Sequence, residues 1–197
     1  MAELQRLCVF CGSSFGTRQE FQAAAERFGR FLADEGIELV YGGGSVGLMG
    51  ALADAVQAAG GKIIGVIPQA LVNAEIAHKN LTDLRIVHSM HERKQLMSDL
   101  ADAFVALPGG FGTFEELLEI VTWAQLGIHV KPIGVLNVAG YYDPLFALIE
   151  RAVMHGFISR AHVELLTVDQ DAAALIEKLR RHEPRPPVRK WLDRAQA

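Results

Sequence analysis

The sequence predicts an α/β protein with a Rossmann-like, doubly wound parallel sheet, folded as a single three-layer domain. Short apolar runs typical of strands alternate with segments whose apolar residues recur at helical spacing. Glycine-rich turns separate the two kinds of segment, as expected where strands lead into helices. The length of 197 residues suits one domain, and 50% of the residues are hydrophobic, which allows one sizeable core.

The first part of the chain carries three predicted strands. Leu7–Phe10 is a short apolar run typical of a buried strand. Arg18–Glu35 repeats apolar residues at helical spacing, and Gly36 stands where a C-terminal cap belongs. The elements expected next are a strand at Glu38–Tyr41, a glycine loop at Gly42–Gly44, a helix at Gly47–Ala59 and a strand at Lys62–Ile67.

The alternation continues after an irregular segment at 69–83, which is expected to form a loop and a short helix. The pattern implies a parallel sheet with helices on both faces. We place the nucleotide-binding catalytic domain at 1–182 and expect 183–197, with three prolines and four basic residues, to be a solvated tail. The later strands are expected at 84–87, 103–107, 133–138 and 165–168, and the helices at 92–100, 114–126, 144–155 and 172–181.

Composition narrows the class of partner. The chain has 19 Lys and Arg against 23 Asp and Glu, so no overall positive field would draw it onto nucleic acid or an anionic membrane. No apolar run approaches the roughly 18–20 residues that span a bilayer, and the N-terminal residues lack a signal peptide's order. We therefore expect a cytoplasmic protein with a small-molecule partner.

Metal and redox chemistry are not expected. Cys8 and Cys11 form a CxxC pattern, but residues three apart on a strand point to opposite faces, which favours reduced structural cysteines. His88 and His91 have HxxH spacing, yet no acidic or thiol partner completes a ligand set. We therefore expect no metal and no cofactor.

Three loops are expected at the carboxyl edge of the sheet, where open parallel sheets bind ligands. They are Cys11–Ser14, Tyr41–Gly47 and Pro108–Thr113. Glycines allow backbone amides to approach an anion, and each following helix N-terminus favours negative charge. The two glycine loops, Tyr41–Gly47 and Pro108–Thr113, are expected to cradle phosphate, and glycines that only form tight turns are the alternative.

The second loop also matches two familiar motifs. Its glycines fit GxGxxG, but the next strand ends without the carboxylate that dinucleotide binding requires. Gly43, Ser45 and Gly47 fit the GxSxG of a serine hydrolase, although no downstream Asp and His stand out as triad partners. No GK[ST] follows either glycine loop, which excludes a P-loop. A serine hydrolase at Ser45 is kept as an alternative function.

Pro108–Glu116 matches the signature PGGxGTxxE completely. With Phe10–Ser14, Tyr41–Gly50 and Met90–Lys94, the sequence resembles the LOG family, the phosphoribohydrolases named after the Lonely Guy plant mutant. The resemblance covers residues 7 to about 180. The signature is shared with relatives called lysine decarboxylases, but the sequence has no recognisable pyridoxal phosphate lysine site.

The resemblance implies an enzyme that hydrolyses the N-glycosidic bond of cytokinin riboside 5'-monophosphates, AMP or both, releasing free base and ribose 5-phosphate. It implies Arg93 and Glu116 as the catalytic pair, and it leaves the base preference open. A homodimer is expected from the family and from the apolar stretch 117–128, for which burial in the core is the alternative. The substrate site implied by the resemblance comprises Glu75, Arg93, Lys94, Gly110, Phe111, Gly112, Thr113, Phe114, Glu115, Glu116 and Thr122.

Breaking the bond between base and ribose builds positive charge on the sugar, so a fixed carboxylate such as that of Glu116 would stabilise the transition state. Arg93 would either pair with the phosphate or orient Glu116. Structural alternatives exist: Thr113 and Glu116 have the spacing of a capping box, and Thr122 is able to bond to its preceding helical turn. A nucleotide-binding or sensing module without turnover is the rival class of function.

Overall fold

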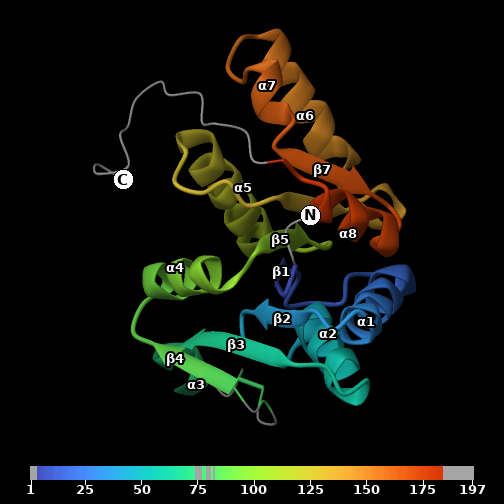
Figure 1. Cartoon of the computed structure of the whole chain (residues 1–197), viewed down its shortest axis with the longest axis vertical. Coiled ribbons are helices and arrows are strands. Elements are labelled where there is room, and N and C mark those ends of the chain that lie inside the picture. Colours follow the sequence, from blue (N-terminus) through green and yellow to red (C-terminus); the bar gives the residue numbers. More distant parts are fainter. Residues whose placement is uncertain (1–3, 74–76, 79–80, 82, 184–197) are drawn as a thin grey trace.

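The computed structural model describes residues 4–73, 77–78, 81 and 83–183, with the side chain of residue 73 left out. In this part of the chain seven strands form one sheet in the order β4-β3-β2-β1-β5-β6-β7, and all neighbouring strands are parallel. Figure 1 shows the strands stacked in this order. The strands are β1 (Arg6–Phe10), β2 (Glu38–Tyr41), β3 (Ile63–Pro68), β4 (Asp83–Val87), β5 (Ala103–Ala106), β6 (Ile133–Leu136) and β7 (Leu166–Asp169).

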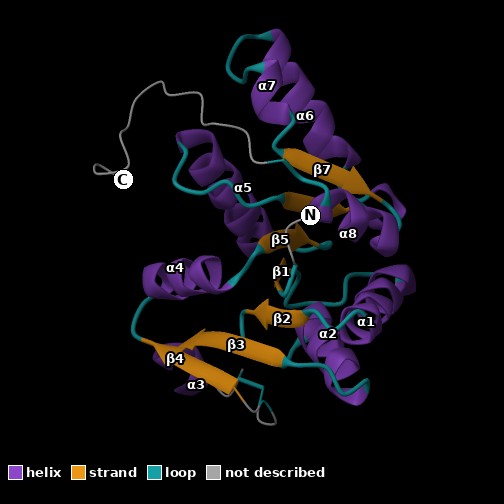
Figure 2. Cartoon of the chain, in the orientation of Figure 1, coloured by secondary structure: helices purple, strands orange, loops and turns teal. Residues whose placement is uncertain are grey.

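Helices cover both faces of the sheet, so the predicted three-layer fold is confirmed (Figure 2). Residues of α1, α2 and α8 form the core on one face, and residues of α4, α5 and the start of α6 form the core on the other. The helices are α1 (Gln19–Asp34), α2 (Gly47–Ala58), α3 (Gln69–Asn73), α4 (Met90–Leu100), α5 (Phe111–Leu126), α6 (Asp143–Met154), α7 (Arg160–Val163) and α8 (Ala172–Arg180).

The alternation of side chains along β1 separates the two cores. Leu7 and Cys11 face the α1–α2 side, whereas Cys8 lies in the core on the α4–α5 side. Both cysteines are free and buried, and burial raises the pKa of both thiols. The prediction that the two cysteines lie on opposite faces of the sheet is confirmed.

The direction of strand addition reverses between β1 and β5. The chain first builds outward from β1 to β4 and then returns through α4 to place β5 on the other side of β1. The loops that follow β1 and β5 therefore lie side by side at the carboxyl edge, where the Gly12 amide donates to the Pro108 carbonyl at 3.0 Å. This is the position at which doubly wound sheets bind ligands.

Every predicted strand and helix is present, and the main correction concerns α5. The sequence predicts a helix at 114–126, but α5 begins at Phe111, with Gly110 as its N-cap. Three glycines close to this terminus weaken the helical pattern of the first turn in the sequence, because glycine disfavours helix. The four-residue helix α7 was not predicted. The predicted tail lies outside the described residues except for Glu183.

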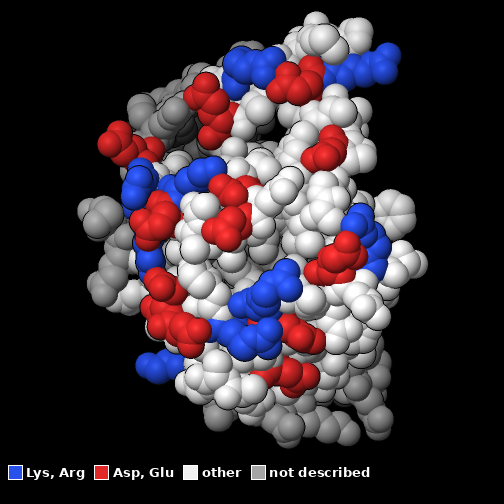
Figure 3. Space-filling model, turned by 90° about the vertical axis from the view of Figure 1, so that its right-hand side faces the viewer, with Lys and Arg blue, Asp and Glu red and all other residues white. Residues whose placement is uncertain are grey.

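The face that carries α1, α2 and α8 is shown in Figure 3, where acidic and basic side chains are interspersed. This distribution agrees with the near balance of charges in the sequence. Within the ranges that the structure covers, no helix has both the length and the apolar character required to cross a bilayer.

Candidate active site

The start of α5 presents backbone amides at the carboxyl edge of the sheet. Because α5 begins at Phe111, its first hydrogen bond is donated by Phe114 to the Gly110 carbonyl, at 3.0 Å. The amides of Gly110, Phe111, Gly112 and Thr113 consequently have no acceptor within the helix. Such amides, together with the positive end of the helix dipole, favour an anionic ligand.

The glycines of this segment differ in whether the fold would have space for a side chain at their positions. A Cβ on Gly109 would lie 2.1 Å from Thr113 Oγ1, so the fold itself requires glycine there. A Cβ on Gly110 or Gly112 would meet nothing within 4 Å, and neither residue has a left-handed backbone. Internal packing therefore gives no reason for glycine at 110 and 112, whereas a ligand lying against the backbone does.

A cavity of about 260 Å³ lies between the loops that follow β1 and β5. It adjoins the amide-bearing segment and joins backbone groups to aromatic and hydroxyl side chains. Its walls are formed by Gly12, Ser13, Ser14, Phe15, Gly16, Phe21, Leu48, Pro108, Gly109, Gly110 and Tyr141.

Arg93 reaches from α4 across the end of β2. Its side chain is only 10% exposed, and its Nε donates to the Val66 carbonyl at 3.1 Å. A Cβ on Gly42 would lie 1.9 Å from Arg93 Nη2, so the guanidinium occupies the space that a side chain at position 42 would fill. The first glycine of the YGGG segment thus has a steric role in the site.

Arg93 Nη1 lies 3.4 Å from Glu116 Oε1, and only 12% of the Glu116 side chain is exposed. Burial raises the pKa of Glu116 to about 6, although the Arg93 guanidinium acts in the opposite direction. Glu116 is therefore largely ionised at neutral pH and still basic enough to accept a proton. Arg93 and Glu116 thus form an ion pair whose two side chains are largely shielded from solvent.

Lys94 joins α4 to α5. Its Nζ lies 2.5 Å from Glu115 Oε1 and 2.9 Å from Glu119 Oε1. Desolvation lowers the pKa of Lys94, but the hydrogen bonds to Glu115 and Glu119 outweigh it, and the pKa is raised overall. Lys94 thus braces the two helices that carry Arg93 and Glu116.

The remaining site residues expected from the sequence do not all lie beside Arg93 and Glu116. Thr113 is buried, and Phe111, at 92% exposure, lies in solvent beside it. Phe114 packs on Tyr141 instead, with ring centroids 6.3 Å apart. Thr122 is exposed and donates to the Leu118 carbonyl at 2.7 Å, which is the structural alternative expected for it. It lies roughly 9 Å along α5 from Glu116, and Glu75 lies outside the described residues.

The capping-box alternative for Glu116 is wrong. Thr113 is the third residue of α5 rather than its N-cap, and the N-cap Gly110 has no side chain to accept a hydrogen bond. Glu116 therefore lies in the second turn of the helix, where a carboxylate cannot close a capping box. Its burial beside Arg93 calls for another explanation.

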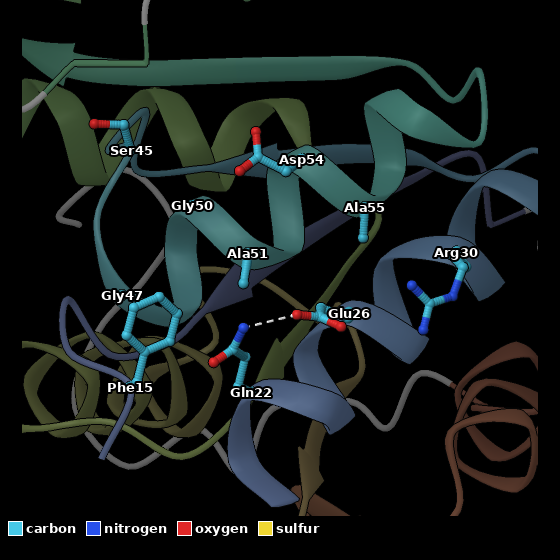
Figure 4. A pocket seen from close by; sticks show the side chains of 10 residues that line it. All are labelled: Phe15, Gln22, Glu26, Arg30, Ser45, Gly47, Gly50, Ala51, Asp54 and Ala55. Atoms are coloured by element: carbon cyan, nitrogen blue, oxygen red, sulfur yellow. Dashed lines mark hydrogen bonds between the residues drawn. The ribbon is translucent and has the colours of Figure 1, made fainter. Parts of the chain in front are cut away.

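The alternative nucleophile Ser45 lines a second hollow, of about 340 Å³, between α1 and α2 (Figure 4). Asp54 lines the same hollow, and its Oδ1 lies 2.9 Å from His78 Nε2. A serine-hydrolase triad directs Nδ1 at the acid and keeps Nε2 for the serine. His78 presents the opposite nitrogen to Asp54, so this arrangement does not favour a hydrolase at Ser45.

Comparison with known proteins identifies the family. A family model described as "Possible lysine decarboxylase" matches residues 49–179. The cytokinin riboside 5'-monophosphate phosphoribohydrolase LOG of Oryza sativa subsp. japonica is 48% identical, over 93% of this chain and 76% of its own length. The enzyme of the same description called LOG3, from Arabidopsis thaliana, is 48% identical over 93% of this chain and 85% of its own length.

The chain belongs to the LOG family. A probable enzyme of the same description, LOGL9 of Oryza sativa subsp. japonica, is 50% identical over 93% of this chain and 81% of its own length. These LOG relatives are named as phosphoribohydrolases, so the decarboxylase description gains no support from them.

The fold of this LOG-family chain also occurs in more distant proteins. The molybdenum cofactor carrier protein of Chlamydomonas reinhardtii matches with a TM-score of 0.68 at 20% identity, over 91% of this chain and 98% of that chain. The molybdenum cofactor binding protein of Rippkaea orientalis matches with a TM-score of 0.68 at 19% identity, over the same shares of the two chains, 91% and 98%. At these identities the likeness concerns the fold alone.

Two residues near the LOG signature were missed by the sequence analysis. Tyr141 and Tyr142 follow β6, and their hydroxyls donate to the carbonyls of Gly109 and Leu107. The only sequence signal is a pair of tyrosines after a predicted strand, which does not indicate which loop they contact. Tertiary structure is needed to bring them to the signature segment.

Proposed function

We propose that this LOG-family protein is a phosphoribohydrolase that acts on cytokinin riboside 5'-monophosphates, AMP or both, with Arg93 and Glu116 as its catalytic pair. One observation carries the proposal: a buried carboxylate with a pKa of about 6 lies beside a guanidinium, on the helix whose N-terminus offers four free amides. The names of the curated LOG relatives support the choice of reaction.

The chemistry follows from the charge that develops on the sugar. The bond between C1' of the ribose and the base nitrogen breaks with its electron pair moving to the base, and an oxocarbenium-like ribose forms. The Glu116 carboxylate stabilises this positive charge and accepts a proton from the water that attacks C1'. The proton then passes to the departing base or to solvent, which leaves free base and ribose 5-phosphate.

The phosphate end of the substrate is assigned to the amides of Gly110–Thr113. Binding energy at this remote group positions the ribose for reaction at C1'. Arg93 is assigned to Glu116, because its contacts to that carboxylate and to the Val66 carbonyl direct the guanidinium inward. Lys94 is assigned to the contact that joins α4 to α5, and to the outer rim of the site.

Release of free base from AMP and from an isoprenoid-substituted nucleotide, compared with release from adenosine, tests this function. We expect turnover of the 5'-monophosphates and little action on the nucleoside, since the nucleoside lacks the phosphate anchor. Equal efficiency on AMP and adenosine would overturn the phosphate assignment. Tight nucleotide binding without release of base would favour the sensing module.

We also propose a cytoplasmic homodimer that uses the outer face of α5. Leu117 and Ile120 belong to the core, so burial accounts for part of this apolar stretch. Leu118 and Ile128 are 42% and 41% exposed, however, and are available to a second copy of the chain.

A further inference from the structure

The turn between β6 and α6 is built to present two consecutive tyrosines. Asn137 is buried; its Oδ1 accepts from the Tyr142 amide at 2.8 Å, and its Nδ2 donates to Asp143 at 2.7 Å. Ala139 has a φ of 53°, a left-handed conformation that residues with a Cβ seldom adopt. The backbone of this turn is therefore strained at Ala139, and the hydrogen bonds of Asn137 stabilise the strained conformation.

The two tyrosine hydroxyls hold the loop that leads into α5. Tyr142 is 1% exposed, and its hydroxyl donates to the Leu107 carbonyl at 2.7 Å. The Tyr141 hydroxyl donates to the Gly109 carbonyl. Tyr141 is half-buried and forms part of the cavity wall next to Gly109 and Gly110.

The ring of Tyr141 is fixed from two sides. It makes an edge contact with Phe21 of α1, with centroids 5.6 Å apart, and stacks on Phe114 of α5. A hydroxyl on a ring held in this way has little freedom, so it fixes the direction of the carbonyl to which it donates.

Because the peptide bond is planar, the hydrogen bond from Tyr141 and the hydrogen bond from Tyr142 have different consequences for the backbone amides that follow. In a trans peptide the carbonyl and the following N–H lie in one plane and point in opposite directions. Holding the Gly109 carbonyl therefore fixes the direction of the Gly110 N–H, one of the four free amides of α5. The Leu107 carbonyl is followed by Pro108, which has no N–H to direct.

We propose that Tyr141 is a positioning residue that orients the Gly110 amide toward the phosphate of a phosphate-ester ligand. This assignment rests on the proposed function for the location of the phosphate. Tyr141 acts through the peptide plane rather than on the reacting atoms, and Tyr142 supports the same loop without directing an amide.

The test compares Tyr141→Phe with its matched control Tyr142→Phe, since each substitution removes one hydroxyl and keeps the ring. Binding of ribose 5-phosphate is measured by calorimetry, and KM and kcat are measured with AMP. Tyr141→Phe is expected to weaken ribose 5-phosphate binding about tenfold and to raise KM for AMP similarly, with kcat within about twofold. Tyr142→Phe is expected to lower Tm and leave ribose 5-phosphate affinity unchanged.

Equal losses of affinity in the two variants, or no loss in Tyr141→Phe, would overturn the proposal and leave Tyr141 a structural residue. Failure of the parent protein to bind ribose 5-phosphate would overturn it as well. A parent protein that binds ribose 5-phosphate but releases no base from AMP would refute the proposed function instead, and the calorimetric comparison would still decide the role of Tyr141.

Discussion

Glu116 combines a stability cost with a chemical use. Its pKa is raised from the ordinary value of 4.5 to about 6, chiefly by burial. The folded state therefore binds this proton more tightly than the unfolded state does. The free energy of unfolding falls as the pH rises from 4.5 through about 6, by about 2 kcal/mol for this one group. A carboxylate kept at such a cost is typical of a functional site.

Replacing Glu116 by Gln is expected to abolish turnover while preserving the fold. The neutral amide resembles the protonated acid, so we expect a Tm at pH 7.5 equal to that of the parent or a few degrees higher. Loss of the negative charge should reduce kcat by about 100-fold or more. Release of adenine from AMP and thermal unfolding provide the two measurements. Activity within a few-fold of the parent would show that the mechanism uses another carboxylate.

The pH dependence of kcat/KM is expected to show an acid limb with a midpoint near pH 6, where Glu116 becomes protonated. The second ionisation of a substrate phosphate also occurs near pH 6, so the limb alone does not identify the group. After burial, the charge that contributes most to raising the pKa of Glu116 is that of Glu115. Glu115→Gln should therefore move the midpoint to lower pH. An unmoved midpoint would assign the limb to the substrate.

At the scale of the element, the segment that leads into α5 contains one glycine that the fold requires, Gly109, and others that we assign to a ligand. A Cβ fits at Gly112 without a close contact, but at Gly109 it collides with Thr113. The two positions are three residues apart and give opposite expectations for stability and binding.

Gly112→Ala is expected to fold with an unchanged or higher Tm, because alanine favours helix over glycine by roughly 0.5–1 kcal/mol. The added methyl group occupies space assigned to the ligand, so the affinity for ribose 5-phosphate should fall at least about tenfold. Gly109→Ala is expected to lower Tm. Unchanged ligand affinity in Gly112→Ala, measured by calorimetry, would contradict the assignment of this turn to the phosphate.

For the whole molecule, light scattering at micromolar concentration is expected to give the mass of a dimer. Leu118→Glu places a charge on the outer face of α5 and should shift the mass to that of a monomer, with the circular dichroism spectrum unchanged. Leu148 of α6 is exposed as well, at 63%, and Leu148→Glu serves as the control that should stay dimeric. A monomeric parent protein would refute the assembly.

Much of the fold was predictable from sequence, because alternating apolar strands and amphipathic helices express a local periodicity. The site was predictable only in part. Arg93 and Glu116 are 23 positions apart on different helices, and no local pattern predicts their contact; the family resemblance supplied it. The start of α5 was predicted too late, because its glycines weaken the helical signal while tertiary contacts at Gly109 fix the turn.

The contact between Arg93 and Gly42 has a consequence for redesign. The space that the guanidinium fills exists because a side chain is missing 51 positions earlier in the chain, where a Cβ would lie 1.9 Å from Nη2. The position of this guanidinium thus depends on two residues, Arg93 itself and the glycine at position 42. Transferring the pair of Arg93 and Glu116 to another parallel sheet would therefore fail unless a glycine were also placed at the position equivalent to Gly42.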